Sequence, residues 1–404
     1  MNTALPFSTF FRLLAKALLC IAACILLMPG SAHAQLDNSA FYDATPWQPE
    51  AEGKLYLNIK DMGYMQNNEY FGTGLDGYTL FGNQFSPGLS YYARPNMRID
   101  AGVFLRKDFG NNNFAQIQPT LSLTVKYDSL TFIFGNLDGS LQHNLIQPMY
   151  NFEKVINNRL ESGSQFLYKN RWFKGDLWVD WQATEYFGSN YHERIFGGLS
   201  VNAALINTPD WGLDIPFQFT AYHNGGQIDT SSAQQFTQMS SALGIGLEKR
   251  FGPGNWLKSI RTENYILGQN NNSLVIPHTW NNGGGLYANL LLKTKWLSIM
   301  GSLWYGHQYM NLKGGFLYQS LGNMYSATGP YIVEGKQLSG ATLRNRNVII
   351  IRLMRDFKIA EGITVTTRLE PVYQTDYAKW EYSYGVFVNF RTDFLLAALK
   401  KKQQ

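Results

Sequence analysis

Cysteine is almost missing from this sequence. Its two cysteines, Cys20 and Cys24, lie within the first 34 residues. The rest of the chain can therefore form no disulfide bond and can use no thiol in catalysis. Long apolar runs are also missing after residue 34, so no transmembrane helix is expected there.

The chain also has little excess of charge of either sign. It holds 34 basic and 29 acidic residues, and two of the basic ones, Arg12 and Lys16, lie in the first 34 residues. The remainder carries 34 − 2 = 32 basic against 29 acidic side chains, a net charge of +3. Such a weak balance gives no support for nucleic acid as a partner.

Residues 1–34 are predicted to be a secretory signal peptide, exported through the general secretory route. Two basic residues come first, an apolar run follows over 18–28, and an A-x-A cleavage site ends at Ala34. An alternative stays open, because the residues before Cys24 are similar to a lipoprotein signal in which that cysteine carries the lipid.

Alternation of apolar and polar residues is the main pattern in the rest of the chain. It is clearest from Trp380 to Phe390, where every second residue is apolar or aromatic. Successive side chains of a strand point to opposite faces, so each such stretch has one apolar face. We expect about sixteen strands, with fourteen to eighteen possible. The first is expected over 54–60, followed by a long loop and a second strand over 81–93.

These strands predict an all-β fold, a transmembrane antiparallel β-barrel. Connections after even-numbered strands are short, whereas most of those after odd-numbered strands are longer. Outer-membrane barrels have short periplasmic turns and longer extracellular loops. The expected parts are the signal peptide over 1–34, a periplasmic lead-in over 35–53, the barrel over 54–394 and a basic periplasmic tail over 395–404.

The signal, the alternating strands, the Asn-, Gly- and aromatic-rich loops and the aromatic last strand together resemble Gram-negative outer-membrane porin-like barrels. In composition they look most like uncharacterised barrels of Bacteroidota. The resemblance covers about residues 50–394 and is one of architecture, not of motifs. It implies the cell outer membrane as the location, with outer-membrane lipid and lipopolysaccharide as neighbours. Many porins end on an aromatic residue, whereas here Phe394 is followed by a basic tail.

Charged side chains on the strands are expected to face the lumen, because an Arg or Lys on the lipid face near the midplane costs about 2 to 4 kcal/mol. The candidates for lining the lumen and setting its selectivity are Arg98, Asp100, Arg106, Lys126, Asp176, Asp180, Arg368, Glu370 and Glu381. The function expected first is a channel for passive diffusion of small polar solutes. A salt-bridged lumen with little conductance is the alternative.

A long insert over 138–160 separates two of the predicted strands. If it folds into the barrel, it would narrow the lumen as a constriction loop. The constriction candidates are then Glu153, Lys154, Arg159 and Glu161. An ordinary surface loop is the other interpretation of this segment.

Two further functions stay open beside the channel. A non-conducting barrel could scaffold an envelope complex, binding protein partners or a second copy through its long loops. A lipid-modifying enzyme is the third, because His223-Asn224-Gly225 partly resembles a phospholipase motif. The serine expected close after that histidine is missing, so no catalytic residue is assigned and the chain is not expected to be an enzyme.

The histidines after residue 34 are all expected in or beside external loops. They are His143, His192, His223, His278 and His307. No two of them have the spacing of metal ligands. We therefore expect no metal site and no cofactor.

Overall fold

The computed structural model describes residues 36–48, 50–71, 76–272, 280–320, 331–333, 336–338 and 344–398. The predicted signal peptide, with Cys24, lies outside the described residues, as does the end of the tail over 399–404. The assignments made to those segments stay predictions.

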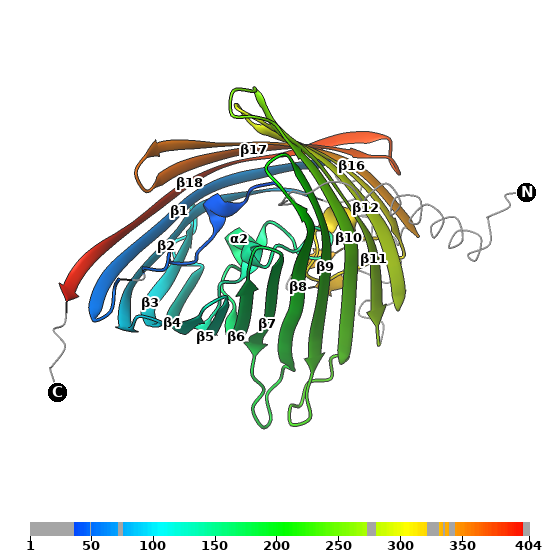
Figure 1. The fold of residues 1–404 in the computed structure, drawn as a ribbon. Helices are drawn as coiled ribbons and strands as arrows, with labels where there is room; N and C mark the ends of the chain where they lie inside the picture. Colours follow the sequence, from blue (N-terminus) through cyan, green and yellow to red (C-terminus); the bar gives the residue numbers. More distant parts are fainter. Residues whose placement is uncertain are drawn as a thin grey trace, which may run out of the picture.

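Sixteen antiparallel strands close into one barrel, in which β18 pairs with β1 (Figure 1). The barrel strands are β1 (Lys54–Phe71), β2 (Asp76–Arg94), β3 (Met97–Asp108), β4 (Gln116–Tyr127), β5 (Leu130–Asn136), β6 (Ser162–Lys169), β7 (Phe173–Ala183), β8 (Glu193–Asn207), β9 (Trp211–Gly225), β10 (Phe236–Arg250), β11 (Leu257–Asn271), β12 (Asn282–Thr294), β13 (Ser298–His307), β16 (Asn345–Ala360), β17 (Ile363–Gln374) and β18 (Lys379–Ala398). A separate hairpin pairs β14 (Tyr331–Val333) with β15 (Lys336–Leu338). The predicted antiparallel barrel of about sixteen strands is thus confirmed.

The short helices are η1 (Ser39–Phe41), η2 (Ser140–His143), α2 (Lys154–Asn157) and η3 (Phe316–Tyr318). Among the described residues, no helix has the length and apolar character needed to cross a membrane. These short helices belong to the segments that connect or precede strands.

The predicted end of the first strand at residue 60 is wrong. β1 continues to Phe71, and its second half alternates with buried Tyr64, Gln66 and Asn68 on one face. The sequence of this stretch suggests a polar loop because two of its inward residues, Gln66 and Asn68, are amides. In a barrel with a polar lumen, amides can occupy the inward positions of a strand. At the other end, β18 continues to Ala398, beyond the barrel end expected at residue 394.

Apolar side chains cover the outside of the barrel. Large exposed ones on its strands include Leu121, Leu177, Leu243, Leu290 and Leu303. A closed barrel satisfies all backbone hydrogen bonds between its strands, which is the condition for crossing a bilayer without helices. The chain is therefore an outer-membrane β-barrel of a Gram-negative envelope.

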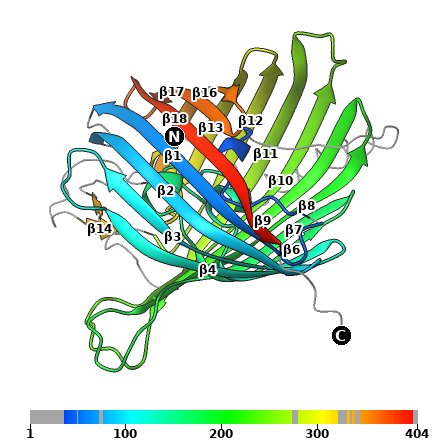
Figure 2. The same cartoon turned by 90° about the vertical axis from the view of Figure 1, so that its left-hand side faces the viewer.

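The two ends of the barrel differ in the length of the connections between strands. Those over 95–96 and 128–129 are short, whereas those over 137–161 and 226–235 are long. In Figure 2 the C-terminus and the long green hairpins lie at opposite ends of the barrel. Short turns face the periplasm in outer-membrane barrels, so the long hairpins are extracellular.

Tryptophan side chains gather at the end of the barrel that holds the short connections. Trp172, Trp256 and Trp296 are exposed there. The guanidinium of Arg171 lies 4.8 Å from the ring centre of Trp172, and the ammonium of Lys295 lies 4.6 Å from that of Trp296. Aromatic rings of this kind mark membrane–water interfaces. This end of the barrel therefore meets the periplasmic interface.

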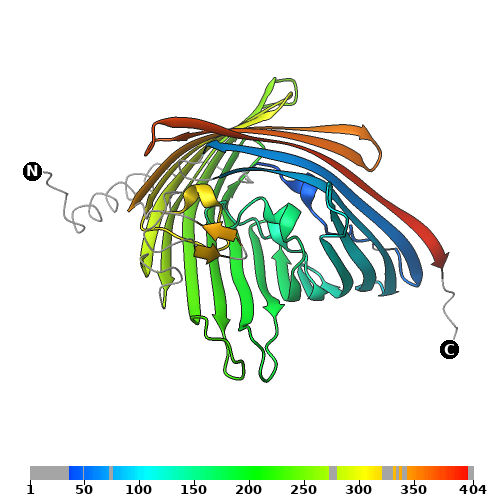
Figure 3. The same cartoon turned by 180° about the vertical axis from the view of Figure 1, so that it is seen from behind.

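The lumen is filled by three segments that are far apart in the sequence: residues 36–48, the insert over 137–161, and residues 308–320. The ring of Phe41 packs edge-on against Phe152 at 5.2 Å and Phe387 at 4.9 Å. The insert meets the third segment where the backbone N–H of Asn151 donates to the carbonyl of Lys313 at 2.7 Å. Figure 3 shows α2 of the insert inside the ring of strands.

Residues 36–48, for which a periplasmic position is predicted, pack inside the barrel. The guanidinium of Arg98 on β3 donates to the carbonyl of Thr45 at 3.0 Å, and that of Arg391 on β18 donates to the carbonyl of Ala40 at 3.0 Å. Strand arginines therefore hold this segment by its backbone. The polar composition that suggests a lead-in serves equally well for contact with a charged lumen.

The chain turns from the barrel wall into the lumen at the end of β5. Gly135 there has a φ of +104°, which L side chains rarely adopt. A Cβ at this position would lie 2.1 Å from the carbonyl oxygen of Leu121 on β4. Glycine is therefore required at the point where the insert leaves the wall.

Candidate functional site

The predicted lumen residues lie on barrel strands and reach the segments that fill the barrel. Arg106 on β3 donates to the carbonyl of Asn157 in the insert at 2.7 Å. The ammonium of Lys126 on β4 lies 5.1 Å from the ring centre of Trp47. Both contacts require side chains that point into the lumen. This is the direction that strand alternation predicts for Arg106 and Lys126.

Several of these charges lie in ion pairs with other lumen side chains. Arg98 Nε lies 2.8 Å from Asp100 Oδ2. On β17, four strands further around the barrel, Glu370 accepts from two arginines, with Arg352 Nε at 3.1 Å and Arg368 Nε at 2.9 Å. Paired charges of this kind fix geometry more than they attract passing ions. A role in selectivity for the nine predicted residues stays a prediction.

All four predicted constriction residues are buried within the lumen. They are Glu153, Lys154, Arg159 and Glu161. Arg159 Nη1 donates to Gln84 Oε1 of β2 at 3.0 Å, and Glu153 Oε1 accepts from Asn68 Nδ2 of β1 at 2.6 Å. The interpretation of the insert as an ordinary surface loop is wrong, because its charged side chains are bound to the inner wall.

The insert contains a fully buried histidine between two carboxylates. His143 Nδ1 lies 2.7 Å from Asp176 Oδ2 of β7, and His143 Nε2 lies 2.6 Å from Glu161 Oε2. The ring stacks on Trp178 with centroids 3.7 Å apart. Tyr150 donates its hydroxyl to Glu161 Oε1 at 2.8 Å. The cluster thus ties the insert to β7 through polar contacts to both ring nitrogens of His143.

Serine, histidine and carboxylates meet in this cluster, but their geometry excludes a hydrolytic triad. Burial alone would lower the pKa of His143, but the charges of Glu161 and Asp176 outweigh burial and raise that pKa to about 10. Ser140 is bound through its backbone N–H to Glu161 Oε1 at 3.0 Å. A general base must be able to accept a proton. An imidazolium whose two N–H groups both donate to carboxylates cannot accept one. His143 is therefore a structural residue.

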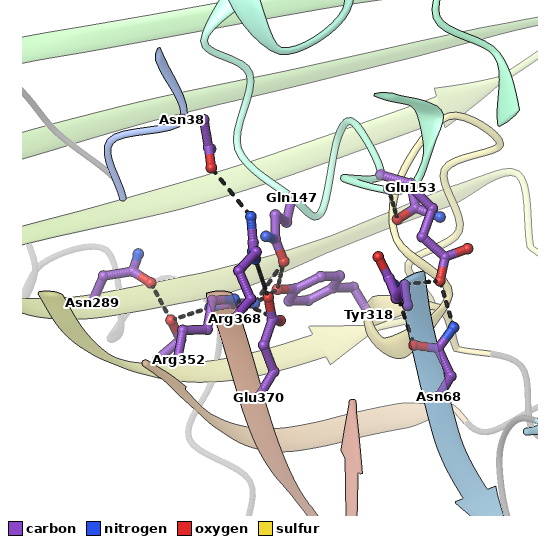
Figure 4. A network of polar contacts seen from close by, with 12 residues as sticks. Asn38, Asn68, Gln147, Glu153, Asn289, Tyr318, Arg352, Arg368 and Glu370 are labelled. Atoms are coloured by element: carbon purple, nitrogen blue, oxygen red, sulfur yellow. Dashed lines mark hydrogen bonds and ion pairs between the residues drawn. The ribbon is translucent and has the colours of Figure 1, made fainter. Parts of the chain in front are cut away.

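Beside the insert lies a cavity of about 340 Å³. Figure 4 shows Glu153 and Asn68 on one side of this region, and Arg352, Arg368 and Glu370 converging near Gln147 and Tyr318 on the other. Gln66 Oε1, which lines the cavity, is buried and has no hydrogen-bond partner among the described residues.

The outer face of the barrel carries a second polar arrangement. His223 points outward near the extracellular end of β9, and its Nδ1 lies 2.8 Å from Thr237 Oγ1 on β10. In the same cross-strand row lie Ile195 on β8 and the exposed Trp181 on β7. Tryptophan rings mark the interface between headgroups and acyl chains. The His–Thr pair thus lies near the outer membrane–water interface.

The other histidines offer no comparable pair. Both ring nitrogens of His192 are bound, one to Asp229 Oδ2 at 2.9 Å and the other to the carbonyl of Ala233 at 2.7 Å. His307 Nδ1 lies 2.7 Å from Asn345 Oδ1. His278 lies outside the described residues. Within the described ranges, no three His, Cys, Asp or Glu side chains are grouped to hold a metal ion.

Sequence reasoning singled out His223 but missed Thr237. The phospholipase-like pattern expects a hydroxyl close behind the histidine, whereas Thr237 follows 14 residues later, on the next strand. Cross-strand register brings the two together, because it places Thr237 opposite His223. Strand pairing is the signal that could have found it.

Comparison with known families and structures gives three results. A family model described as lipid A 3'-O-deacylase-type matches residues 47–399. No match was found among curated protein sequences. Similar solved structures are outer-membrane proteins at low identity.

Among these structures, a loop-deletion mutant of OmpT from Vibrio cholerae is 11% identical with a TM-score of 0.48, covering 84% of this chain and 100% of that one. OprD from Pseudomonas aeruginosa is 10% identical with a TM-score of 0.48, covering 87% and 99%. OpdL from the same organism is 12% identical with a TM-score of 0.46, covering 84% and 99%. None of these values bears on function.

Proposed function

Because this chain belongs to the lipid A 3'-O-deacylase-type family, we propose that it is an outer-membrane hydrolase that cleaves an acyl ester of lipid A. The family match over residues 47–399 is the observation that carries the proposal. The prediction that the chain is not an enzyme is wrong, because the matched family is an enzyme family. Lipopolysaccharide, expected as a neighbour, then becomes the substrate.

The reactive pair of this proposal is His223 with Thr237. In the proposed step, His223 takes the proton of the Thr237 hydroxyl, and Thr237 Oγ1 bonds to the acyl carbonyl carbon. The bond from that carbon to the sugar oxygen breaks, and the proton passes to the sugar. One water molecule then hydrolyses the acyl-threonine ester and releases the fatty acid.

Position supports the outer face over the lumen as the place of reaction. Acyl chains of the outer leaflet surround the barrel from outside. The buried cluster at His143 has no exposed ring atom, since its side chain is 0% exposed. The pair at His223 lies on the surface that lipid contacts, at a hydrogen-bond distance suited to proton transfer.

The first test compares lipid A from cells that produce the protein with lipid A from cells that produce its variants. We expect the wild type to remove one acyl chain, seen as a mass loss in mass spectrometry. His223→Ala and Thr237→Val should lower the rate by about 100-fold or more, because general-base catalysis contributes about that factor. Thr237→Ser should keep much of the activity.

His307→Ala is the matched control, because His307 also points outward near the extracellular end but contacts an amide. It should leave deacylation unchanged. Full activity in His223→Ala would refute the proposed pair, and an inactive wild type would refute the proposed reaction. Folding of each variant is checked by its heat-dependent mobility on gels.

Passive diffusion of small polar solutes is the second candidate. What favours it is a second lumen cavity of about 460 Å³, which shares Asn151, Asn157 and Phe316 with the first. The two cavities adjoin around the insert and together offer room for small solutes. Conductance of the folded protein in a planar bilayer tests this candidate.

A further inference from the structure

The cavity of about 340 Å³ beside the insert is called here the aromatic chamber. Its volume lies near the lower end of the range for small-molecule sites, which favours a compact ligand over a long chain. Among the residues that the structure describes, the aromatic side chains in its lining are Tyr70, Tyr78, Phe152, Phe316, Tyr318 and Phe387. Their rings offer apolar surface against which a bound ring can pack.

Three neighbouring strands form one wall of the aromatic chamber. Gln66 on β1 lies opposite Leu80 on β2 and opposite Gly385 on β18, and all three residues line the chamber. β1 ends at Phe71 and β18 begins at Lys379, and both ends adjoin extracellular connections. The chamber therefore lies in the extracellular half of the lumen, on the side from which external solutes arrive.

Gln66 supplies a hydrogen-bond acceptor that the protein leaves unused. This residue is 7% exposed, and its Oε1 has no hydrogen-bond partner among the described residues. Its Nε2 donates to Asn68 Oδ1 at 3.2 Å and to Glu153 Oε1 at 3.1 Å. Turning the amide over would bring Oε1 against the Glu153 carboxylate, so the orientation is fixed. A buried acceptor without a donor is unfavourable, and a donor on a ligand would satisfy it.

A second amide lines the chamber from the insert. Gln147 Oε1 accepts from Arg352 Nη2 at 2.6 Å and from the hydroxyl of Tyr318 at 3.0 Å. Because both partners donate, they fix which side of the amide carries the oxygen. The amide nitrogen on the other side can donate to a ligand. Figure 4 shows Gln147 and Tyr318 on one side of this region and Glu153 on the other.

The charges around the aromatic chamber cancel. Among the described lining residues, the charged ones are Arg368, Glu153 and Glu370. Glu370 also pairs with Arg352, whose Nε lies 3.1 Å from Glu370 Oε2. Two arginines thus stand beside two glutamates, a balance of 2 − 2 = 0. A charged ligand would lose its hydration without meeting an excess of opposite charge, so the chamber suits an uncharged one.

We propose that the aromatic chamber binds an uncharged saccharide of one or two rings. A saccharide ring carries C–H groups on its faces and hydroxyls around its edge. Its faces can pack on aromatic rings, while its hydroxyls donate and accept hydrogen bonds. One hydroxyl donates to Gln66 Oε1 and another accepts from the amide of Gln147. A fatty acyl chain would fill the apolar space but has no donor for Gln66.

This binding site is separate from the proposed hydrolysis. The aromatic chamber lies inside the barrel, whereas His223 lies on its outer face. Binding is measured without turnover, and His223→Ala should bind a saccharide as the wild type does. Failure of one proposal therefore leaves the other standing.

The experiment is titration of the full folded protein in lipid nanodiscs with glucose, maltose and sucrose, followed by saturation-transfer NMR. We expect saturable binding of at least one of these sugars. Gln66→Met should weaken it by roughly twofold to tenfold, the effect of losing one hydrogen bond between neutral groups. Leu80→Trp should abolish it, because the larger side chain would occupy the chamber. Leu80→Trp removes no polar contact, so it tests the proposal even if Gln66→Met does not fold.

Gln118→Met is the matched control. It removes a glutamine of β4 that is outside the chamber lining and whose Oε1 accepts from Gln116 Nε2 at 2.8 Å. Its affinity should equal that of the wild type. Absence of saturable binding for all three sugars, or wild-type affinity in either folded chamber variant, would overturn the proposal. Binding of decanoate in place of the sugars would identify an acyl site and overturn it as well.

Discussion

Histidine shows how the fold decides what a single residue does in this chain. His143 and His223 are both expected near external loops by sequence. The structure places His143 between Glu161 and Asp176 in the lumen and His223 beside Thr237 on the outer face. One is fixed as a cation and the other has a hydroxyl partner. Residue type alone distinguishes neither role.

The charge of His143 predicts a pH-dependent stability. Its pKa is raised to about 10 in the folded state, against about 6.5 when unfolded. The stability that it contributes is therefore fully present below pH 6.5 and is lost as the pH rises through about 10. At pH 6, His143→Gln should lower the free energy of unfolding by about 3 to 5 kcal/mol, because two buried carboxylates lose their partner.

The measurement is urea unfolding of the wild type and His143→Gln at pH 6, 8 and 10, followed by tryptophan fluorescence. The gap between the two proteins should shrink across this series. A gap that grows with pH would contradict the assignment of His143 as a cation. His307→Gln, with an amide partner on the outer face, should show no such trend.

The sequence could predict where single charges point but not what they meet. Alternation along β3 places Arg98 and Asp100 inward, and they do lie inward. The partners of Arg98 and Arg106 include the carbonyls of Thr45 and Asn157, far along the chain. Contacts of this kind depend on how separate segments fill the lumen, which no local pattern contains.

At the scale of elements, the strands are more predictable than the segments between them. Apolar alternation identifies β18 and most other strands, because lipid imposes one apolar face on every strand. It misses the second half of β1, where inward amides read as a loop. The position of the insert was equally open, since a surface loop and a lumen segment have similar composition.

The position of the insert in the lumen leads to a prediction about ion conductance. We expect the wild type to show little conductance in a planar bilayer, because residues 137–161 are bound to the inner wall. Replacing 139–160 by a short glycine and serine turn should give stable and larger ohmic steps. Large steps in the wild type would instead support passive diffusion as its function.

A milder variant separates opening of the lumen from damage to the barrel. Arg159→Ala removes the contacts of the insert with Gln84 and with the carbonyl of Phe41 while leaving every strand intact. It should raise conductance in the same direction, but less than the deletion. Unchanged gel mobility would show that the barrel itself is still folded.

At the scale of the whole molecule, contact with lipid determines how much a charged substitution on the outer face destabilises the folded barrel. Leu243 lies at the middle of β10 and is 56% exposed, and Leu247 lies on the same face closer to the periplasmic end. Leu243→Arg should make folding into bilayers less favourable by about 2 to 4 kcal/mol, and Leu247→Arg by about 0 to 1 kcal/mol. Equilibrium refolding into lipid vesicles measures both. Equal costs at the two positions would contradict the depth assigned to β10.

The global architecture was the most predictable level, and the activity was the least. Alternation and loop lengths predict a barrel in an outer membrane, and the sixteen-strand barrel confirms that prediction. For hydrolysis the sequence offered only the partial motif at His223, because the proposed pair joins this histidine to a residue on the neighbouring strand. The family match supplied what the spacing of residues along the chain could not.

The segment over 36–48 links the filling of the lumen to the closing of the barrel. It directly precedes β1, and it contacts Phe387 and Arg391 of β18, across 351 positions of sequence in the case of Ala40 and Arg391. These contacts join the two edges of the seam between the first and last strands. A growing barrel must therefore stay open along this seam until the last strand arrives. The segment can complete its contacts with Phe387 and Arg391 only when β18 has taken its place beside β1.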